Sequence, residues 1–155
     1  MNANKKPLVI LMADDDEDDC LLAKKALEKA DIGGRLDFVT DGEALLDYLC
    51  HRGDYAETAK FPKPDIILLD LNMPKMNGIE ALKGIKANPE LCHIPTIILT
   101  TSRADCDISE SYSLGANSFI TKPVSFMGLV DMMHNIKTYW FDVVELPNGS
   151  VAKNC

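Results

Sequence analysis

Five polar side chains stand where apolar segments of the sequence end. They are Asp14, Asp15, Asp70, Thr100 and Lys122. The apolar segments show no alternation of polar and apolar residues, which is typical of strands buried on both faces of a parallel sheet. The carboxyl ends of parallel strands meet at one edge of an open sheet, where such sheets bind ligands. We therefore expect these side chains to converge on one crevice.

This combination of side chains favours phosphoryl chemistry. Three carboxylates within a few ångströms of one another cannot all stay ionised without a cation. Because every ligand atom is an oxygen, a hard ion is favoured over zinc: Mg²⁺ first, with Mn²⁺ as the alternative. Lys122 supplies a second positive charge, and Thr100 supplies a hydroxyl donor. A carboxylate such as that of Asp70 can act as the nucleophile that forms an aspartyl phosphate.

The acidic run at the first strand end is longer than such a site needs. Six consecutive carboxylates occupy positions 14–19. We expect Asp14 and Asp15 to point into the crevice. Asp16 to Asp19 fall in the first turn of the following helix, where the helix dipole favours negative charge. We interpret these later acids as solvated capping residues.

The elements that position the five side chains alternate along the chain. Apolar runs predict strands at 8–13, 36–40, 65–71, 94–100 and 118–121. Helical spacing predicts helices over 20–30, 41–49, 79–88, 105–114 and 125–139, the first stopped by Gly33-Gly34. Strand and helix thus alternate five times, which predicts an α/β fold with a parallel sheet covered by helices on both faces.

Composition narrows the class of protein. The 155 residues suffice for one domain with a core, and 24 acidic against 16 basic residues give a net charge of −8. That charge argues against nucleic-acid binding, and no apolar run is long enough to span a membrane. The five cysteines are odd in number and lack a C-x-x-C spacing, so we expect neither a disulfide framework nor a zinc site. A cytoplasmic protein fits best.

Four short motifs then resemble a known family. They are "LMADDDEDD" at 11–19, "PDIILLDLNMPKMNG" at 64–78, "IPTIILTTS" at 94–102 and "FITKP" at 119–123. In this order they resemble the receiver domain of two-component response regulators. The resemblance covers 7–140, with a disordered N-terminus at 1–6 and a C-terminal extension or tail at 141–155. It implies a flavodoxin-like, doubly wound sheet of five parallel strands in the order 2-1-3-4-5.

The resemblance also implies a role for each side chain at the crevice. Asp70 would accept a phosphoryl group from a histidine kinase. Asp15 would bind Mg²⁺ directly, Asp14 mostly through water, and Asn72 through its backbone carbonyl. The protein would therefore be a signalling domain rather than an enzyme acting on outside substrates.

The remaining implied roles concern the response to phosphorylation. Lys122 would pair with the phosphoryl group, and Pro123 would follow a cis peptide bond. Thr100 would close onto the phosphoryl oxygens, and Phe119 would turn inward when Thr100 moves. Phe119 can also be read as an ordinary core residue.

A narrower resemblance rests on the long loop "HRGDYAETAKFPKPD" at 51–65 and on "IKTYWFDVVELP" at 136–147. Both resemble the single-domain regulators that pair with bacterial phytochrome kinases. This implies a homodimer through helix 4, strand 5, helix 5 and the C-terminal extension. The apolar residues of that extension are Tyr139, Trp140, Phe141, Val143 and Val144. Packing of these residues against their own domain is an equally good interpretation.

Two other functions remain open from the residues. A phosphohydrolase with an aspartyl nucleophile would place a second aspartate two residues after Asp70 as the general acid, but position 72 is asparagine. A phosphorylation-silent interaction module is the second alternative, and the presence of all five polar side chains argues against it.

Overall fold

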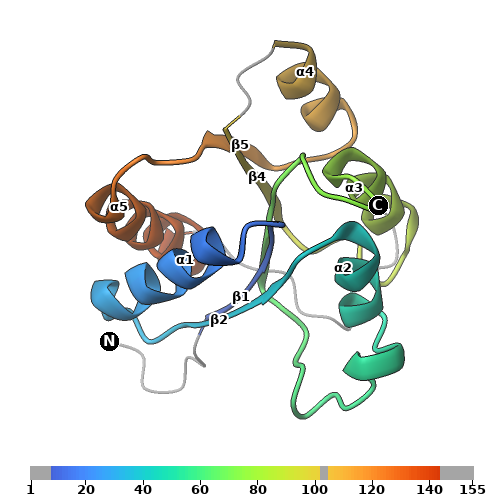
Figure 1. Cartoon of the computed structure of the whole chain (residues 1–155), viewed down its shortest axis with the longest axis horizontal. Helices are drawn as coiled ribbons and strands as arrows, with labels where there is room; N and C mark the ends of the chain where they lie inside the picture. Colours follow the sequence, from blue (N-terminus) through green and yellow to red (C-terminus); the bar gives the residue numbers. More distant parts are fainter. Residues whose placement is uncertain (1–7, 102–104, 144–155) are drawn as a thin grey trace.

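The chain is a parallel sheet with helices on both faces, as Figure 1 shows for the computed structural model. The structure describes residues 8–101 and 105–143. The sheet has five parallel strands in the order β2-β1-β3-β4-β5, which confirms the predicted fold class. The strands are β1 (Val9–Ala13), β2 (Arg35–Val39), β3 (Ile66–Leu69), β4 (Thr96–Thr100) and β5 (Ser118–Thr121).

The helices divide between the two faces of the sheet. In Figure 1, α1 and α5 lie on one side, and α2 and α3 lie on the other, with α4 near the β5 edge. The helices are α1 (Glu17–Ala30), α2 (Gly42–Leu49), α3 (Gly78–Ala87), α4 (Asp105–Ser113) and α5 (Phe126–Ile136). A short 3₁₀ helix, η1 (Gly53–Tyr55), follows α2, and a π-helical segment, η2 (Lys137–Val143), follows α5.

Two apolar cores explain why the strand sequences are apolar throughout. Side chains alternate across a strand, so Ile10 and Met12 pack toward α1 and α5, whereas Leu11 and Ala13 pack toward α2 and α3. Ile66 and Leu68 of β3 belong to the first core, and Ile67 and Leu69 belong to the second. Both faces of the central strands are therefore dry, and polar groups are left to the strand ends.

Side-chain caps fix where the helices begin. Asp16 accepts hydrogen bonds from the backbone N–H groups of Asp18 and Asp19 at the start of α1. Asp41 and Ser125 cap α2 and α5, as their positions before the helical patterns predict. The α1 helix ends at Ala30, and its C-cap residue Asp31 adopts the left-handed conformation at φ 52°, just before the Gly33-Gly34 pair that was expected to stop the helix.

The strands are shorter than the apolar runs. The run 94–100 becomes a strand only from Thr96, because Pro95 has no N–H to donate and contributes only its carbonyl, which accepts from Ile67 N at 2.9 Å. The run 65–71 forms a strand over 66–69. Its first residue, Asp65, instead uses its carboxylate to accept a hydrogen bond from Val9 N at 2.9 Å.

The helical structure at the C-terminal end extends past the predicted boundary near Tyr139. The α5 helix ends at Ile136, and the chain continues as η2 to Val143. Tyr139 is 54% exposed, while Trp140 packs against the core between the sheet, α1 and α5. The predicted disordered segment 1–6 and the tail after Val143, including Val144, lie outside the described residues.

The cysteines differ from expectation at one position. Cys20 and Cys50 are free thiols, whereas Cys92 is disulfide-bonded. Spacing along the sequence could not predict this, because the fold decides which thiols meet. In the described parts of the chain, no helix combines the length and the apolar character needed to cross a membrane.

Candidate functional site

The backbone of neighbouring strands brings the site residues to one edge of the sheet. Asp14 follows β1, and its N–H donates to Val39 O in β2 at 3.1 Å. Asp70 follows β3, and its N–H donates to Ala13 O in β1 at 2.9 Å. Lys122 follows β5, and its backbone N–H donates to Thr100 O in β4 at 2.9 Å. The backbone hydrogen bonds of the sheet therefore continue by one bond beyond β1, β3 and β5, and they fix the positions of Asp14, Asp70 and Lys122 at the same edge.

Three of the carboxylates form a potential metal site. One oxygen from each of Asp14, Asp15 and Asp70 lies within 4.8 Å of the other two. Asp14 is fully buried, Asp70 is 6% exposed, and Asp15 is exposed to solvent. Two buried carboxylates beside one that is open to water fit a hard divalent ion that keeps part of its hydration shell.

Lys122 is held by three carboxylates. Its Nζ forms an ion pair with Asp14 Oδ2 and lies 3.0 Å from Asp19 Oδ2 and 3.3 Å from Asp70 Oδ2. Burial by itself would lower the pKa of Lys122, but the hydrogen bonds to Asp14 and Asp19 outweigh it, and the pKa is raised. The ammonium is therefore charged at any physiological pH.

Asp14 is the residue that most needs a cation. Burial raises the pKa of Asp14 above its ordinary value, although Lys122 and a hydrogen bond from Asp16 N oppose the rise. The nearby charge of Asp70 adds to the rise. One ammonium thus does not fully offset the carboxylates gathered here, so a divalent ion would be accommodated readily.

Asp19 is a member of this cluster that the sequence interpretation missed. It was expected to be a solvated helix-capping residue like Asp16, yet it contacts Lys122 across 103 residues of sequence. The missed signal is helical spacing. Asp19 lies one turn before Ala23 and next to Cys20, both fully buried, so it stands at the border of the buried face of α1.

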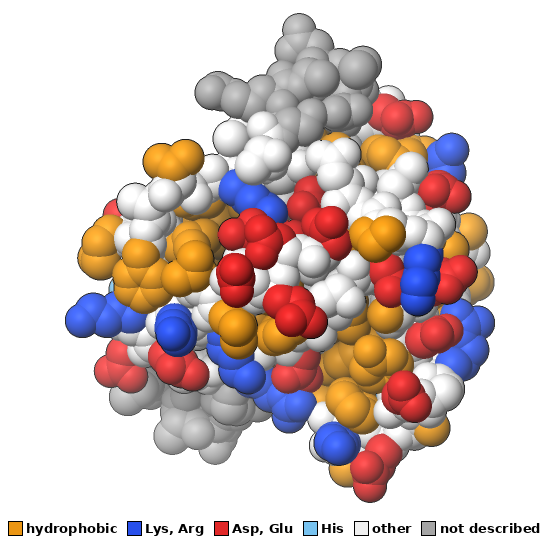
Figure 2. Space-filling view, viewed as in Figure 1, with side chains coloured by type: hydrophobic (Ala, Val, Ile, Leu, Met, Phe, Trp, Pro, Cys, Tyr) orange, Lys and Arg blue, Asp and Glu red, His pale blue; other side chains and the backbone are white. Residues whose placement is uncertain are grey.

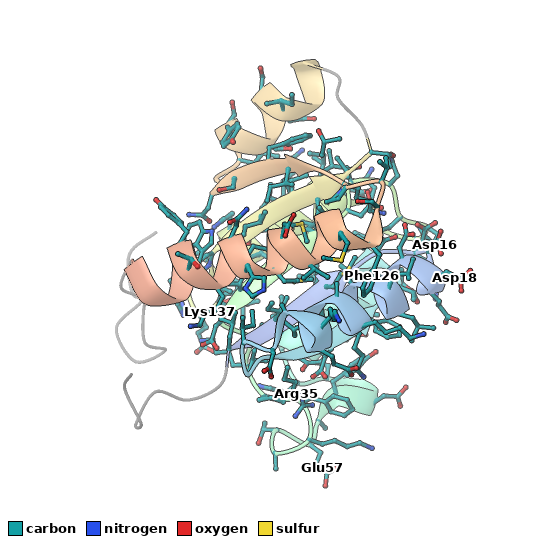
Figure 3. The ribbon with its side chains drawn as sticks, turned by 90° about the vertical axis from the view of Figure 1, so that its left-hand side faces the viewer. Asp16, Asp18, Arg35, Glu57, Phe126 and Lys137 are labelled. Atoms are coloured by element: carbon teal, nitrogen blue, oxygen red, sulfur yellow. The ribbon has the colours of Figure 1, made fainter. Side chains whose placement is uncertain are left out.

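Figures 2 and 3 show where acidic side chains lie on the surface. Figure 2 shows acidic side chains gathered in the middle of the face that carries the strand ends, with a basic side chain beside them. In Figure 3, Asp16 and Asp18 project outward at the N-terminal end of α1, with Phe126 at the start of α5 on the same side. The solvated interpretation of Asp16 and Asp18 agrees with this view.

The structure also places the other predicted residues. Asn72 is exposed, and its N–H donates to Asp70 Oδ1 at 3.2 Å. Thr100 is fully buried at the end of β4. Phe119 is half-buried, packs against the core on the α2 and α3 face, and donates its N–H to the Tyr112 hydroxyl at 3.1 Å.

The predicted cis peptide bond before Pro123 is wrong. No peptide bond in the described chain is cis, so Lys122 and Pro123 are joined by a trans bond. The trans isomer is the intrinsically favoured one even before proline, by about 0.5–1 kcal/mol. With this trans bond Lys122 still reaches Asp70.

A family model decides what this arrangement belongs to. The model described as "Response regulator receiver domain" matches residues 10–134. The chain belongs to this family. It is a response regulator of two-component signalling, and the match runs from the second residue of β1 to two residues before the end of α5.

Relatives of this receiver domain are similar over nearly their whole length. Response regulator Rcp1 of Synechocystis sp. (strain ATCC 27184 / PCC 6803 / Kazusa) is 38% identical over 141 residues, which cover 91% of this chain and 94% of Rcp1. The phosphorylated cyanobacterial phytochrome response regulator RcpA has a TM-score of 0.83 at 35% identity, covering 92% of this chain and 99% of RcpA. The Mn²⁺-bound form of Rcp1 has a TM-score of 0.79 at 38% identity and covers 92% and 100%.

Proposed function

We propose that Asp70 accepts a phosphoryl group from a phosphohistidine of a histidine kinase. The carrying observation is that Asp70 Oδ2 lies 3.3 Å from Lys122 Nζ while the same carboxylate shares a cluster with Asp14 and Asp15. In the transfer, the bond between the histidine nitrogen and phosphorus breaks as a bond from phosphorus to an Asp70 oxygen forms. The imidazole leaves with the electron pair of the broken bond, and Lys122 balances charge on the phosphoryl oxygens.

Asp14, Asp15 and Asp70 would hold Mg²⁺, or Mn²⁺ in its place, with the backbone carbonyl of Asn72 as a further ligand. The spacing of the three carboxylates and the raised pKa of Asp14 support this assignment. The similar Rcp1 has a Mn²⁺-bound form. When bound, the ion supplies charge neutralisation for the phosphoryl oxygens. Asp14 and Asp15 would hold that ion beside the acceptor oxygen of Asp70.

Thr100 and Phe119 would transmit the change. Thr100 lies at the end of β4, next to Lys122 through the backbone bond Lys122 N to Thr100 O, and would move onto the phosphoryl oxygens. Phe119 is half-buried and lines a groove of about 530 Å³ between β5 and α5. A half-buried ring at the edge of the core can change its packing at a lower cost than a fully buried one, which fits a two-state element biased by a local charge.

A bacterial phytochrome is the kinase that the comparisons favour. RcpA is a phytochrome response regulator, and another similar structure, RPA3017 of R. palustris, is described in red light signaling, with a TM-score of 0.85 at 33% identity. The long loop at 51–65 is also held in place by aromatic contacts. The rings of Tyr48, Tyr55 and Phe61 pack against one another in tilted and edge-to-face contacts with centroids 5.0–5.6 Å apart, which holds the loop on α2. We assign this chain the same kind of partner.

A homodimer through α4, β5, α5 and η2 is the output that the surface supports. Tyr112 and Tyr139 are 49% and 54% exposed, and both line the groove that also contains Phe119 and Trp140. Exposed aromatic residues around a groove are typical of protein–protein contacts. Light scattering with and without Mg²⁺ and beryllofluoride tests this. A mass that stays at one protomer in both states contradicts a dimer.

The phosphohydrolase alternative lacks the general acid that such an enzyme needs. Asn72 stands where the second aspartate would protonate a leaving group, and an amide cannot do so. Most of the family are signalling domains, and the curated relative named as a probable cyclic di-GMP phosphodiesterase is matched over only 25% of its own length. A silent interaction module is disfavoured by the assembled set of Asp14, Asp15, Asp70 and Lys122.

Incubation with acetyl phosphate and Mg²⁺, followed by intact-mass spectrometry, tests the proposal. Wild type should gain one phosphoryl group, and Asp70→Asn should gain none. Asp31→Asn is a matched control, because Asp31 sits at the exposed end of α1 in a left-handed conformation that asparagine also adopts. Phosphorylation of the Asp70→Asn variant would contradict the assignment.

A further inference from the structure

Three carboxylates surround the Lys122 ammonium before any phosphoryl group arrives. An ammonium has three donors, and Lys122 Nζ has three carboxylate partners: Asp14, Asp19 and Asp70. Its side chain is only 13% exposed, so water has little room to act as a fourth partner. A phosphoryl group on Asp70 can take over the donor that Asp70 itself uses, and it gains a second donor from Lys122 only if Asp14 or Asp19 releases one.

Asp19 is the partner that is free to leave. Asp14 and Asp70 have side chains that are 1% and 8% exposed, and both belong to the metal-binding set. The Asp19 side chain is 40% exposed and is not a member of that set. Water can solvate Asp19 when it lets go, whereas releasing Asp14 would leave a buried carboxylate without a counterion.

We infer that Asp19 is a positioning residue that holds Lys122 in the resting state and competes with the phosphoryl group for it. The inference rests on the proposed phosphorylation of Asp70. Asp19 does not touch the phosphoryl group. It acts through Lys122. Breaking the contact between Asp19 and Lys122 also removes a link between the first turn of α1 and the residue that follows β5.

The electrostatics of the cluster give Asp19 opposite effects on the two ligands. Its negative charge helps to attract a divalent cation, because it offsets part of the positive charge that Lys122 places beside Asp14 and Asp70. The same charge and the contact of Asp19 with Lys122 oppose a phosphoryl group, which is negative and needs Lys122. Removing the charge should therefore weaken Mg²⁺ binding and strengthen the binding of phosphoryl oxygens.

The variant Asp19→Asn tests this, with Asp18→Asn as the matched control. Asp18 carries the same charge in the same turn of α1, is exposed, and projects outward. Three quantities are measured. Isothermal titration calorimetry gives the Mg²⁺ affinity, and the beryllofluoride affinity and the rate of phosphorylation by acetyl phosphate are measured at saturating Mg²⁺.

Asp19→Asn should lower the Mg²⁺ affinity and raise both beryllofluoride affinity and phosphorylation rate, each by about two- to fivefold, the size expected for a partly exposed ion pair. Asp18→Asn should change each by less than half as much. Asp19→Glu keeps a carboxylate and should fall between wild type and Asp19→Asn. A purely structural role of Asp19 would change the free energy of unfolding, but it would not change the affinities for Mg²⁺ and beryllofluoride in opposite directions.

The outcomes separate this inference from the proposed function. If Asp19→Asn matches Asp18→Asn while wild type is phosphorylated and Asp70→Asn is not, the inference about Asp19 is wrong and the proposed function stands. If wild type gains no phosphoryl group at saturating Mg²⁺, the proposed function itself fails, and the inference fails with it. If both affinities change in the same direction, competition for Lys122 is excluded.

Discussion

Gly78 lies so close to Asp70 that a β-carbon at position 78 would stand 2.3 Å from the Asp70 carbonyl oxygen and 2.6 Å from Leu71 Cα. The contact is between two pieces of main chain, so no side chain can turn away to relieve it. Gly78 N also donates to Leu71 O at 2.9 Å. The first residue of α3 is thereby pressed against the loop that carries the proposed phosphoacceptor.

Replacing Gly78 with alanine should therefore damage the metal site as well as the fold. The added methyl group must push Asp70 and Leu71 away from α3, at a cost of about 1–3 kcal/mol in the free energy of unfolding. Displacing a ligand from its supporting contacts should weaken Mg²⁺ binding by about tenfold or more. Urea unfolding and calorimetric Mg²⁺ titration measure the two effects.

Gly84 in the same helix is the control for that substitution. A β-carbon there would meet only the end of the Leu46 side chain, at 3.1 Å, and that side chain can move. Because alanine favours a helix over glycine, Gly84→Ala should leave stability within about 1 kcal/mol of wild type. Equal losses of Mg²⁺ affinity in both variants would show that the Gly78 contact does not position the site.

Lys122→Met should destabilise the metal-free protein by about 3 kcal/mol, because it leaves the buried Asp14 carboxylate without its ammonium. Mg²⁺ should restore more stability to this variant than it adds to wild type, since a divalent ion replaces the missing positive charge. Thermal unfolding in chelator and in Mg²⁺ gives both numbers.

The double variant Asp14→Asn/Lys122→Met separates charge burial from packing. Removing both partners of a buried pair costs much less than removing one, because no uncompensated charge remains. The double variant should therefore be more stable than Lys122→Met in chelator. A double variant that is less stable than either single variant would mean that packing of the lysine stem, rather than the ion pair, dominates.

Acid should weaken the fold through His93. Burial lowers the pKa of His93 below its ordinary value of 6.5, and the nearby charges of Lys63 and Lys86 lower it further. As pH falls below 6.5, the unfolded chain takes up this proton first, so stability falls with acidification until the folded pKa is passed. His93→Gln should flatten the dependence of the unfolding free energy between pH 7 and 5.

His134→Gln is the matched control for His93→Gln. His134 lies in the last turn of α5 and is exposed to solvent. Its replacement should leave the slope between pH 7 and 5 close to that of wild type. A slope that is the same in wild type and His93→Gln would show that His93 is not the titrating group.

The sequence predicted which functional residues stand at the ends of strands, because the signals for a buried strand and its end are local. A continuous apolar run that ends in a charged residue marks both a buried strand and the edge of the sheet at which ligands bind. Asp14, Asp70 and Lys122 were placed in this way, and the fold brings them together. The five-stranded order followed from the family resemblance, and the structure confirms it.

The missed features depend on contacts across the chain. Asp19 looked like any acid in a first helical turn, and only the fold, which brings the start of α1 next to the residue that follows β5, gives it Lys122 as a partner. The bond before Pro123 has two accessible isomers, so its sequence alone does not decide between them. The disulfide bond of Cys92 likewise depends on the fold rather than on cysteine spacing.

The central claim is that Asp70 becomes an acyl phosphate, and borohydride trapping tests it most directly. Protein treated with acetyl phosphate and Mg²⁺ is reduced with borohydride, which converts an aspartyl phosphate to homoserine, and is then digested for peptide mass spectrometry. The account predicts homoserine at position 70 and at no other aspartate. Homoserine at Asp14 or Asp15, or trapping that persists in Asp70→Asn, would contradict it.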